Sequence, residues 1–121
     1  MYQRLILVGF LGSGPEQKYI ANGDPVTSFN VATSRKYADK DETTWFRVTV
    51  WGKQAESCAT YLHKGSRVLV EGRLRPDESG GAKAFQRKDG SWSANYEVTA
   101  EAVRFLTPKS GDAPVDQDVP F

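Results

Sequence analysis

The chain has 121 residues, 39% of them hydrophobic, and a formal net charge of +1. This length predicts one domain with a short appendage, and the apolar content excludes wholesale disorder. Residues 107–121 carry one basic and three acidic side chains, whereas residues 1–106 carry fifteen basic and twelve acidic ones, an asymmetry that points weakly to nucleic-acid contact.

Short segments separated by glycines open the chain. Leu5–Val8 is an apolar run that ends at Gly9, and it predicts a buried strand. Gly9–Pro15 is rich in glycine and is expected to be a loop. Gln17–Ala21 predicts a short strand, because the turn signal Asn22–Pro25 follows it directly.

Two longer β-rich segments follow. Val26–Thr33 and Thr43–Trp51 both predict strands, and Gly52 ends the second one. Between them, Ser34–Glu42 concentrates charged side chains. We therefore expect a solvated hairpin loop over that segment.

One helix is expected, at Lys53–Leu62. Its apolar side chains recur at i, i+3, i+4 and i+7 and form one stripe, which consists of Ala55, Cys58, Ala59 and Leu62. Gly65 follows at a position that suits the end of a helix.

The remainder is again predicted to be β-rich. Arg67–Leu74 predicts a strand and Pro76–Lys83 a loop. A hairpin is expected across Asp89-Gly90, which joins Ala84–Lys88 to Trp92–Leu106. Hydrophobic residues become sparse after residue 107, so we expect residues 1–106 to form the domain and residues 107–121 a disordered acidic tail with a hydrophobic tip.

This order of elements is typical of one fold. Three strands, one helix and further strands predict an all-β domain with one helix, a five-stranded Greek-key OB barrel. Another small mixed barrel or a sandwich would give a similar pattern, and the pattern alone does not exclude it.

The segment Thr44–Trp51 is the most informative part of the sequence. Side chains of a strand alternate between its two faces, so Trp45, Arg47 and Trp51 are expected on the face opposite the apolar one. Aromatic rings beside cations stack on nucleobases without reading their sequence. The alternative is that the two rings cover a second core or a subunit interface.

Other aromatic and basic side chains support a groove that follows a nucleic-acid backbone. Further stacking candidates are Tyr37, Phe85 and Trp92. The candidates for phosphate contact are Arg35, Lys36, Lys40, Arg47, Lys53, Arg73, Arg75, Lys83 and Arg87. Taken singly, a loop lysine is more often a solvated charge, so the prediction depends on the whole pattern.

The C-terminal tip offers a second signal. It ends on an aromatic side chain beside a proline, and its candidate partner-binding residues are Asp116, Asp118, Val119, Pro120 and Phe121. Such a segment suits capture by an apolar pocket with basic residues around it. If this segment is judged alone, a frayed chain end that carries a phenylalanine by chance is the better interpretation.

Enzymatic and metal functions find no support in the sequence. Cys58 and His63 are the single cysteine and histidine, too few for a Cys/His zinc site. No Walker-type phosphate loop or spaced catalytic pair is found, so no catalytic residue, metal or cofactor is expected. No apolar run approaches the length of a membrane span, and we expect a cytoplasmic, nucleoid-associated protein.

Several motifs resemble those of bacterial single-stranded DNA-binding proteins, in the same order over about residues 3–106. They are Leu5–Gly12, Pro15-Glu16, Tyr19–Gly23, Phe29–Ser34, Thr44–Val48, Trp51–Glu56, Tyr61–Ser66 and Val70–Leu74. The final Asp-Val-Pro-Phe is similar to that family's acidic, hydrophobic tip.

The resemblance implies an OB fold, assembled as a homotetramer, that binds single-stranded DNA in replication, recombination and repair. It also implies stacking by Trp45 and Trp51, with Tyr37 and Phe85 at further stacking positions, and docking of Phe121 on replication and repair enzymes. Phe46 departs from the family, which often has histidine there at a subunit contact. The loop between Leu74 and Phe85 is also longer than expected, and Gln117 interrupts the acidic run.

Two alternatives remain besides this function, with a hydrolase or nuclease as a more distant third. An accessory OB module of a replication-restart complex would use the tail and bind DNA only weakly. An OB protein for RNA or oligosaccharides would prefer those ligands to DNA.

Overall fold

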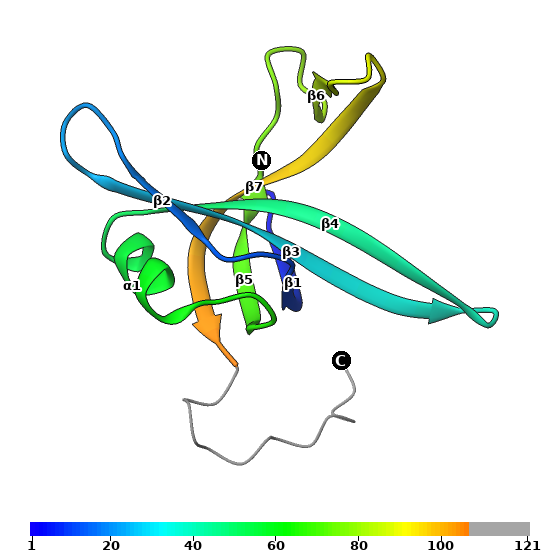
Figure 1. Ribbon diagram of the computed structural model, residues 1–121, viewed down its shortest axis with the longest axis horizontal. Helices are drawn as coiled ribbons and strands as arrows, with labels where there is room; N and C mark the ends of the chain where they lie inside the picture. Colours follow the sequence, from blue (N-terminus) through cyan, green and yellow to red (C-terminus); the bar gives the residue numbers. More distant parts are fainter. Residues whose placement is uncertain (107–121) are drawn as a thin grey trace.

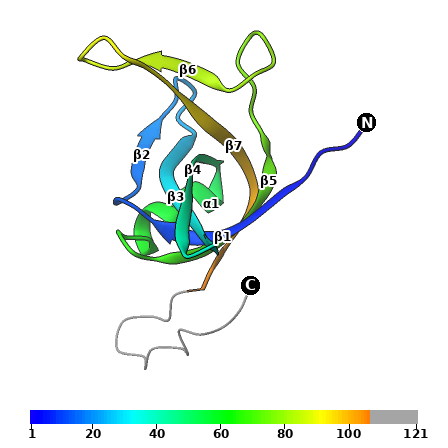
Figure 2. The same cartoon turned by 90° about the vertical axis from the view of Figure 1, so that its right-hand side faces the viewer.

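The computed structural model describes residues 1–106, which form a closed barrel of five strands with one helix. The barrel strands are β1 (Leu5–Leu11), β3 (Pro25–Tyr37), β4 (Lys40–Trp51), β5 (Arg67–Leu74) and β7 (Trp92–Phe105). They pair in the order β1-β5-β7-β4-β3, and a β1–β3 pairing closes the ring (Figure 2). All neighbours are antiparallel except β4 and β7. This is the OB topology that the sequence predicts.

Three elements lie outside the ring of strands. β2 (Glu16–Tyr19) pairs with β3, and β6 (Lys83–Gln86) pairs with the beginning of β7. Helix α1 (Lys53–Tyr61) connects β4 to β5 and contacts β2, β3, β4 and β7. Figure 1 shows the three elements at different places around the barrel, with β6 at the top and α1 on the left.

The core is apolar and receives side chains from every barrel strand and from the helix. Phe29 on β3 is its largest fully buried side chain. The other members are Leu7, Leu11, Val31, Val48, Val50, Ala55, Cys58, Leu62, Val68, Val70 and Val98. The predicted helix stripe therefore supplies three core residues, and strand alternation supplies most of the rest.

Strand β1 continues beyond the glycine that was expected to end it. A Cβ at Gly9 would collide with the carbonyl oxygen of Ala32 on β3. Glycine therefore lets β1 approach β3 closely while it still pairs with β5, and the strand runs on to Leu11. The loop expected at Gly9–Pro15 is accordingly shorter.

The solvated loop expected at Ser34–Glu42 is wrong. β3 and β4 continue as a two-stranded ribbon that extends away from the barrel to the right in Figure 1, and only Ala38 and Asp39 form the turn. Both turn residues have positive φ, 49° and 66°. Charge explains the continuation, because Arg35 lies opposite Glu42 in the register and Lys36 opposite Asp41.

The remaining differences are shifts of element ends. The short strands lie at Glu16–Tyr19 and Lys83–Gln86, one residue earlier than expected at their starts, and β7 ends at Phe105. The helix ends at Tyr61, with Leu62 as its C-cap. The expected tail, residues 107–121, lies outside the described residues.

Candidate nucleic-acid interface

Strands β3 and β4 present one open face between β2 and β7, which we call the outer face. Trp45, Arg47 and Trp51 lie on it, opposite Ala32, Asn30 and Val26 of β3 in the register. The two indoles are 53% and 44% exposed, whereas Val48 and Val50 on the other face are buried. The rings are six residues apart along the strand, or about 20 Å. The structure thus brings together two half-exposed rings with a guanidinium between them.

The position of the Trp45 ring depends on a glycine that sequence analysis did not single out. A Cβ at Gly12 would lie 2.6 Å from Cη2 of Trp45, and still closer to Cζ3. Gly12 follows β1 directly and donates its backbone N–H to the carbonyl oxygen of Asn30, 3.1 Å away. The indole therefore lies close against the backbone at Gly12, and any larger residue there would displace it.

Arg47 lies among polar groups on the outer face. Its Nη1 donates to Oδ1 of Asn30 at 3.4 Å, and its Nη2 lies 3.8 Å from Oε2 of Glu16 on β2. On its other side, Glu97 of β7 occupies the register position next to Arg47. The Arg47 side chain is one-third exposed, so a ligand lying between the two tryptophans can contact it.

The β3–β4 ribbon carries four of the predicted site residues on two faces. Lys36 lies on the same side of the ribbon as Trp45. Trp45 pairs with Ala32 of β3, and Lys36 follows Ala32 by an even number of residues on that strand. Tyr37, Arg35 and Lys40 lie on the opposite side. Tyr37 is 60% exposed, and the guanidinium of Arg35 lies 5.7 Å from the centre of its ring.

The β6–β7 hairpin separates the two remaining aromatic candidates. Phe85 pairs with Ser93 and Gln86 pairs with Trp92, so the two rings point to opposite faces of the hairpin. Along β7, Ser93 and Glu97 are an even number of residues apart, so they share a side of the strand, and Glu97 lies on the outer face. Trp92 instead shares the side of the buried Val98. Phe85 therefore lies on the face that is continuous with the outer face, and Trp92 lies on the reverse.

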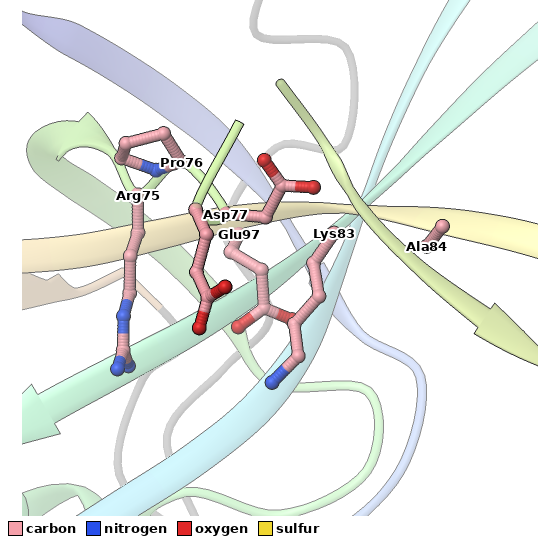
Figure 3. A pocket seen from close by; sticks show the side chains of 7 residues that line it. Arg75, Pro76, Asp77, Lys83, Ala84 and Glu97 are labelled. Atoms are coloured by element: carbon pink, nitrogen blue, oxygen red, sulfur yellow. The ribbon is translucent and has the colours of Figure 1, made fainter. Parts of the chain in front are cut away.

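A hollow of about 490 Å³ lies beside this face, between the β5–β6 connection and β7. Arg75 and Lys83 line it together with carboxylates from Asp77, Glu78 and Glu97 (Figure 3). The pKa of Asp77 is lowered, because its carboxylate accepts hydrogen bonds from the Ser79 hydroxyl and from backbone N–H groups of the same loop. The carboxylates offset the two cations in this hollow.

The other predicted cations lie at different places. Arg73 is exposed on β5, opposite Thr99 of β7, on a side of the sheet that is continuous with the outer face. Arg87 lies in the β6–β7 turn and donates to the hydroxyl of Ser93 at 3.0 Å. Lys53 is the exposed first residue of α1. The partner-binding candidates Asp116, Asp118, Val119, Pro120 and Phe121 lie outside the described residues.

Sequence analysis also missed Glu16 and Tyr96. Glu16 contacts Arg47 from a different strand, so spacing along the chain gives no sign of the contact. Tyr96 packs its ring against Phe46, with centroids 5.9 Å apart, and is 54% exposed. The alternation of side chains along the predicted strand could have identified Tyr96, because Tyr96 follows Trp92 by four residues and so shares its face.

A second exposed face is apolar and lies on β1 and β5. Ile6 and Phe10 are 60% and 47% exposed there. The guanidinium of Arg67 lies 4.9 Å from the centre of the Phe10 ring. Apolar patches exposed on small domains are typical of interaction surfaces.

Residues 1–106 contain neither a membrane-spanning helix nor a cluster of metal-binding side chains. No helix in this range has the length and apolar character needed to cross a membrane. Within the same range, no group of three or more His, Cys, Asp or Glu side chains is arranged to hold a metal ion.

Comparison with known proteins gives a consistent result. Residues 2–106 match the model of the single-strand binding protein family. A single-stranded DNA-binding protein of Neisseria meningitidis is 34% identical over 94% of this chain and 67% of its own length. One of Bacillus cereus is 38% identical over 92% of the chain and 64% of its own length, and single-stranded DNA-binding protein A of Bacillus subtilis is 35% identical over 92% and 63%. The matches thus span about two thirds of these relatives' own lengths.

Proposed function

Because the chain belongs to the single-strand binding protein family, we propose that it binds single-stranded DNA on the outer face of its OB barrel, without strong sequence preference. The observation that carries this proposal is the pair of half-exposed rings, Trp45 and Trp51, on either side of Arg47. Exposed indoles are costly in water, and stacking on bases removes that cost.

Stacking and phosphate contact would act together on this face. Trp45 and Trp51 stack on bases, and Phe85 extends the aromatic path toward β6. Arg47, Arg73 and Lys36 share the face and contact phosphates, so counterions are released and affinity falls as salt rises. Tyr37 and Trp92 lie on the reverse sides of their ribbons, where a strand that passes around the ribbon would contact them.

We also propose that the domain works as a homotetramer that protects single strands in replication, recombination and repair. The apolar face around Ile6 and Phe10 supports assembly, since it would be covered by another copy. The C-terminal tip from Asp116 to Phe121 recruits partner enzymes, and the protein acts in the cytoplasm on nucleoid DNA.

Tryptophan fluorescence tests the binding proposal directly. Titration with dT oligomers should quench emission to saturation, less strongly at high salt, and duplex DNA should not compete. Trp45→Ala and Trp51→Ala should each weaken binding by about 1–3 kcal/mol. Tyr61→Ala is the matched control, because Tyr61 is 66% exposed but lies on α1.

Three results would contradict the proposal. They are unchanged emission on adding dT, stronger binding to RNA than to DNA, and tryptophan variants that bind as well as the parent. For recruitment, deletion of residues 116–121 should abolish capture of replication and repair proteins and leave dT binding intact.

A further inference from the structure

We propose that Glu16 is a built-in competitor of DNA phosphates at Arg47, and that it holds the affinity for single-stranded DNA below what the outer face could reach. This inference rests on the proposed function and adds a residue that regulates affinity at the same site. Its basis is the placement of one exposed carboxylate beside the central cation of the interface.

The register places Glu16 on the outer face. Glu16 pairs with Ser28 of β3, and Ser28 in turn pairs with Thr49 of β4, so all three lie on the same side of the sheet. Arg47 is two residues from Thr49 and shares that side. The carboxylate therefore reaches Arg47 across β3, at the place where a phosphate between the two tryptophans would lie.

The contact is electrostatic and does not fix the position of the guanidinium. The Nη2–Oε2 distance of 3.8 Å is too long for a hydrogen bond, and the Glu16 side chain is 64% exposed. The side-chain hydrogen bond of Arg47 goes instead to Asn30, at the paired position of the neighbouring strand. Loss of the Glu16 charge should therefore leave the guanidinium in place.

Arg47 also keeps donors for a phosphate. A guanidinium has five N–H groups, and the hydrogen bond to Asn30 uses one nitrogen. Arginine binds phosphate best through two parallel hydrogen bonds. Nη2 can donate one of them once the Glu16 carboxylate has moved away. Glu16 lies on the short, exposed strand β2, so it can turn into solvent when DNA binds.

The other charges near Arg47 on this face do not replace Glu16, because one is a carboxylate without an ion pair to Arg47 and the other is a cation. Glu97 occupies the register position beside Arg47 on β7, but no ion pair joins these two described side chains. Lys18 lies two residues from Glu16 on the same side of β2. Glu16 is thus the carboxylate within 4.0 Å of Arg47 among the described residues.

The experiment compares Glu16→Gln with Glu56→Gln in dT titrations monitored by tryptophan fluorescence. Both variants remove one negative charge, but Glu56 lies on α1 and is not part of the outer face. We expect Glu16→Gln to bind about two- to fivefold more tightly than the parent, the range of an exposed ion pair. The slope of log affinity against log salt should steepen by up to about 0.7, the value for one more phosphate on a single strand. Glu56→Gln should change neither quantity appreciably.

A double-mutant cycle with Arg47→Gln identifies the partner. If Glu16 acts through Arg47, Glu16→Gln should have no effect on affinity in the Arg47→Gln background. Unchanged or weaker binding by Glu16→Gln, an equal gain in Glu56→Gln, or a gain that persists without Arg47 would each overturn the inference. Failure of the parent protein itself to bind dT would instead contradict the proposed function.

Discussion

Gly12→Ala should impair DNA binding through Trp45 alone. The new methyl group would lie 2.6 Å from Cη2 of the indole, far inside van der Waals contact, so the ring must move. Because the indole is 53% exposed, it can swing into solvent without disturbing the core. Gly12 has no positive φ, so alanine adds no backbone strain.

The size of the effect follows from what Trp45 contributes. A stacked ring is worth about 1–3 kcal/mol per base, and a displaced ring loses part of that. We therefore expect Gly12→Ala to weaken dT binding by about 1 kcal/mol or more, at least roughly fivefold. The free energy of unfolding should fall by less than about 1 kcal/mol, as for other surface changes.

Fluorescence titration, near-UV circular dichroism and urea unfolding measure these quantities. Gly14→Ala is the matched control, because a Cβ at Gly14 meets no atom within 4 Å. In a Trp45→Ala background, Gly12→Ala should cost no further affinity. Parental affinity in Gly12→Ala, or a loss that persists without Trp45, would refute the reasoning.

Three further predictions follow from other contacts. Phe85→Ala should weaken dT binding more than Trp92→Ala, because only Phe85 shares the outer face; equal losses in titration would contradict the register argument. Gln54→Ala should lower the free energy of unfolding by about 1–2 kcal/mol in urea and leave dT affinity unchanged, since the Gln54 amide donates to the carbonyl of Glu101 and accepts from the N–H of Val103. Burial raises the pKa of Cys58 from 9.0 to about 11, so the folded protein keeps a proton that the unfolded chain loses above pH 9. The contribution of Cys58 to stability should thus be complete below pH 9 and fall by roughly 2–3 kcal/mol between pH 9 and 11. Urea titrations at both pH values should therefore show a smaller loss of stability for Cys58→Ala than for the parent.

Local patterns determined most of the fold. The β-rich run from Thr43 to Trp51 predicts β4 and places Trp45 and Trp51 on the face opposite Val48 and Val50, as the structure has them. The helix stripe likewise predicts three core residues, Ala55, Cys58 and Leu62, whereas its fourth member, Ala59, is only half-buried. These inferences hold because side-chain direction in a strand or helix follows directly from sequence position.

Pairing between distant segments decided the rest. The sequence by itself could not show that β3 and β4 continue as a ribbon through a charged segment, because the stabilising pairs, such as Arg35 with Glu42, form across strands. The two faces of the β6–β7 hairpin also depend on register, and a slip of one residue would exchange Phe85 and Trp92.

The sequence thus determined the strands of the barrel, its helix and the pair of outward tryptophans, since each depends on alternation or periodicity along one segment. The tertiary structure decided what surrounds those rings. Gly12 beneath Trp45 and Glu16 beside Arg47 come from segments about thirty residues away along the chain, and only closure of the sheet brings them there. Contacts of this kind have no local pattern, because they arise from strand order and register rather than from neighbouring residues.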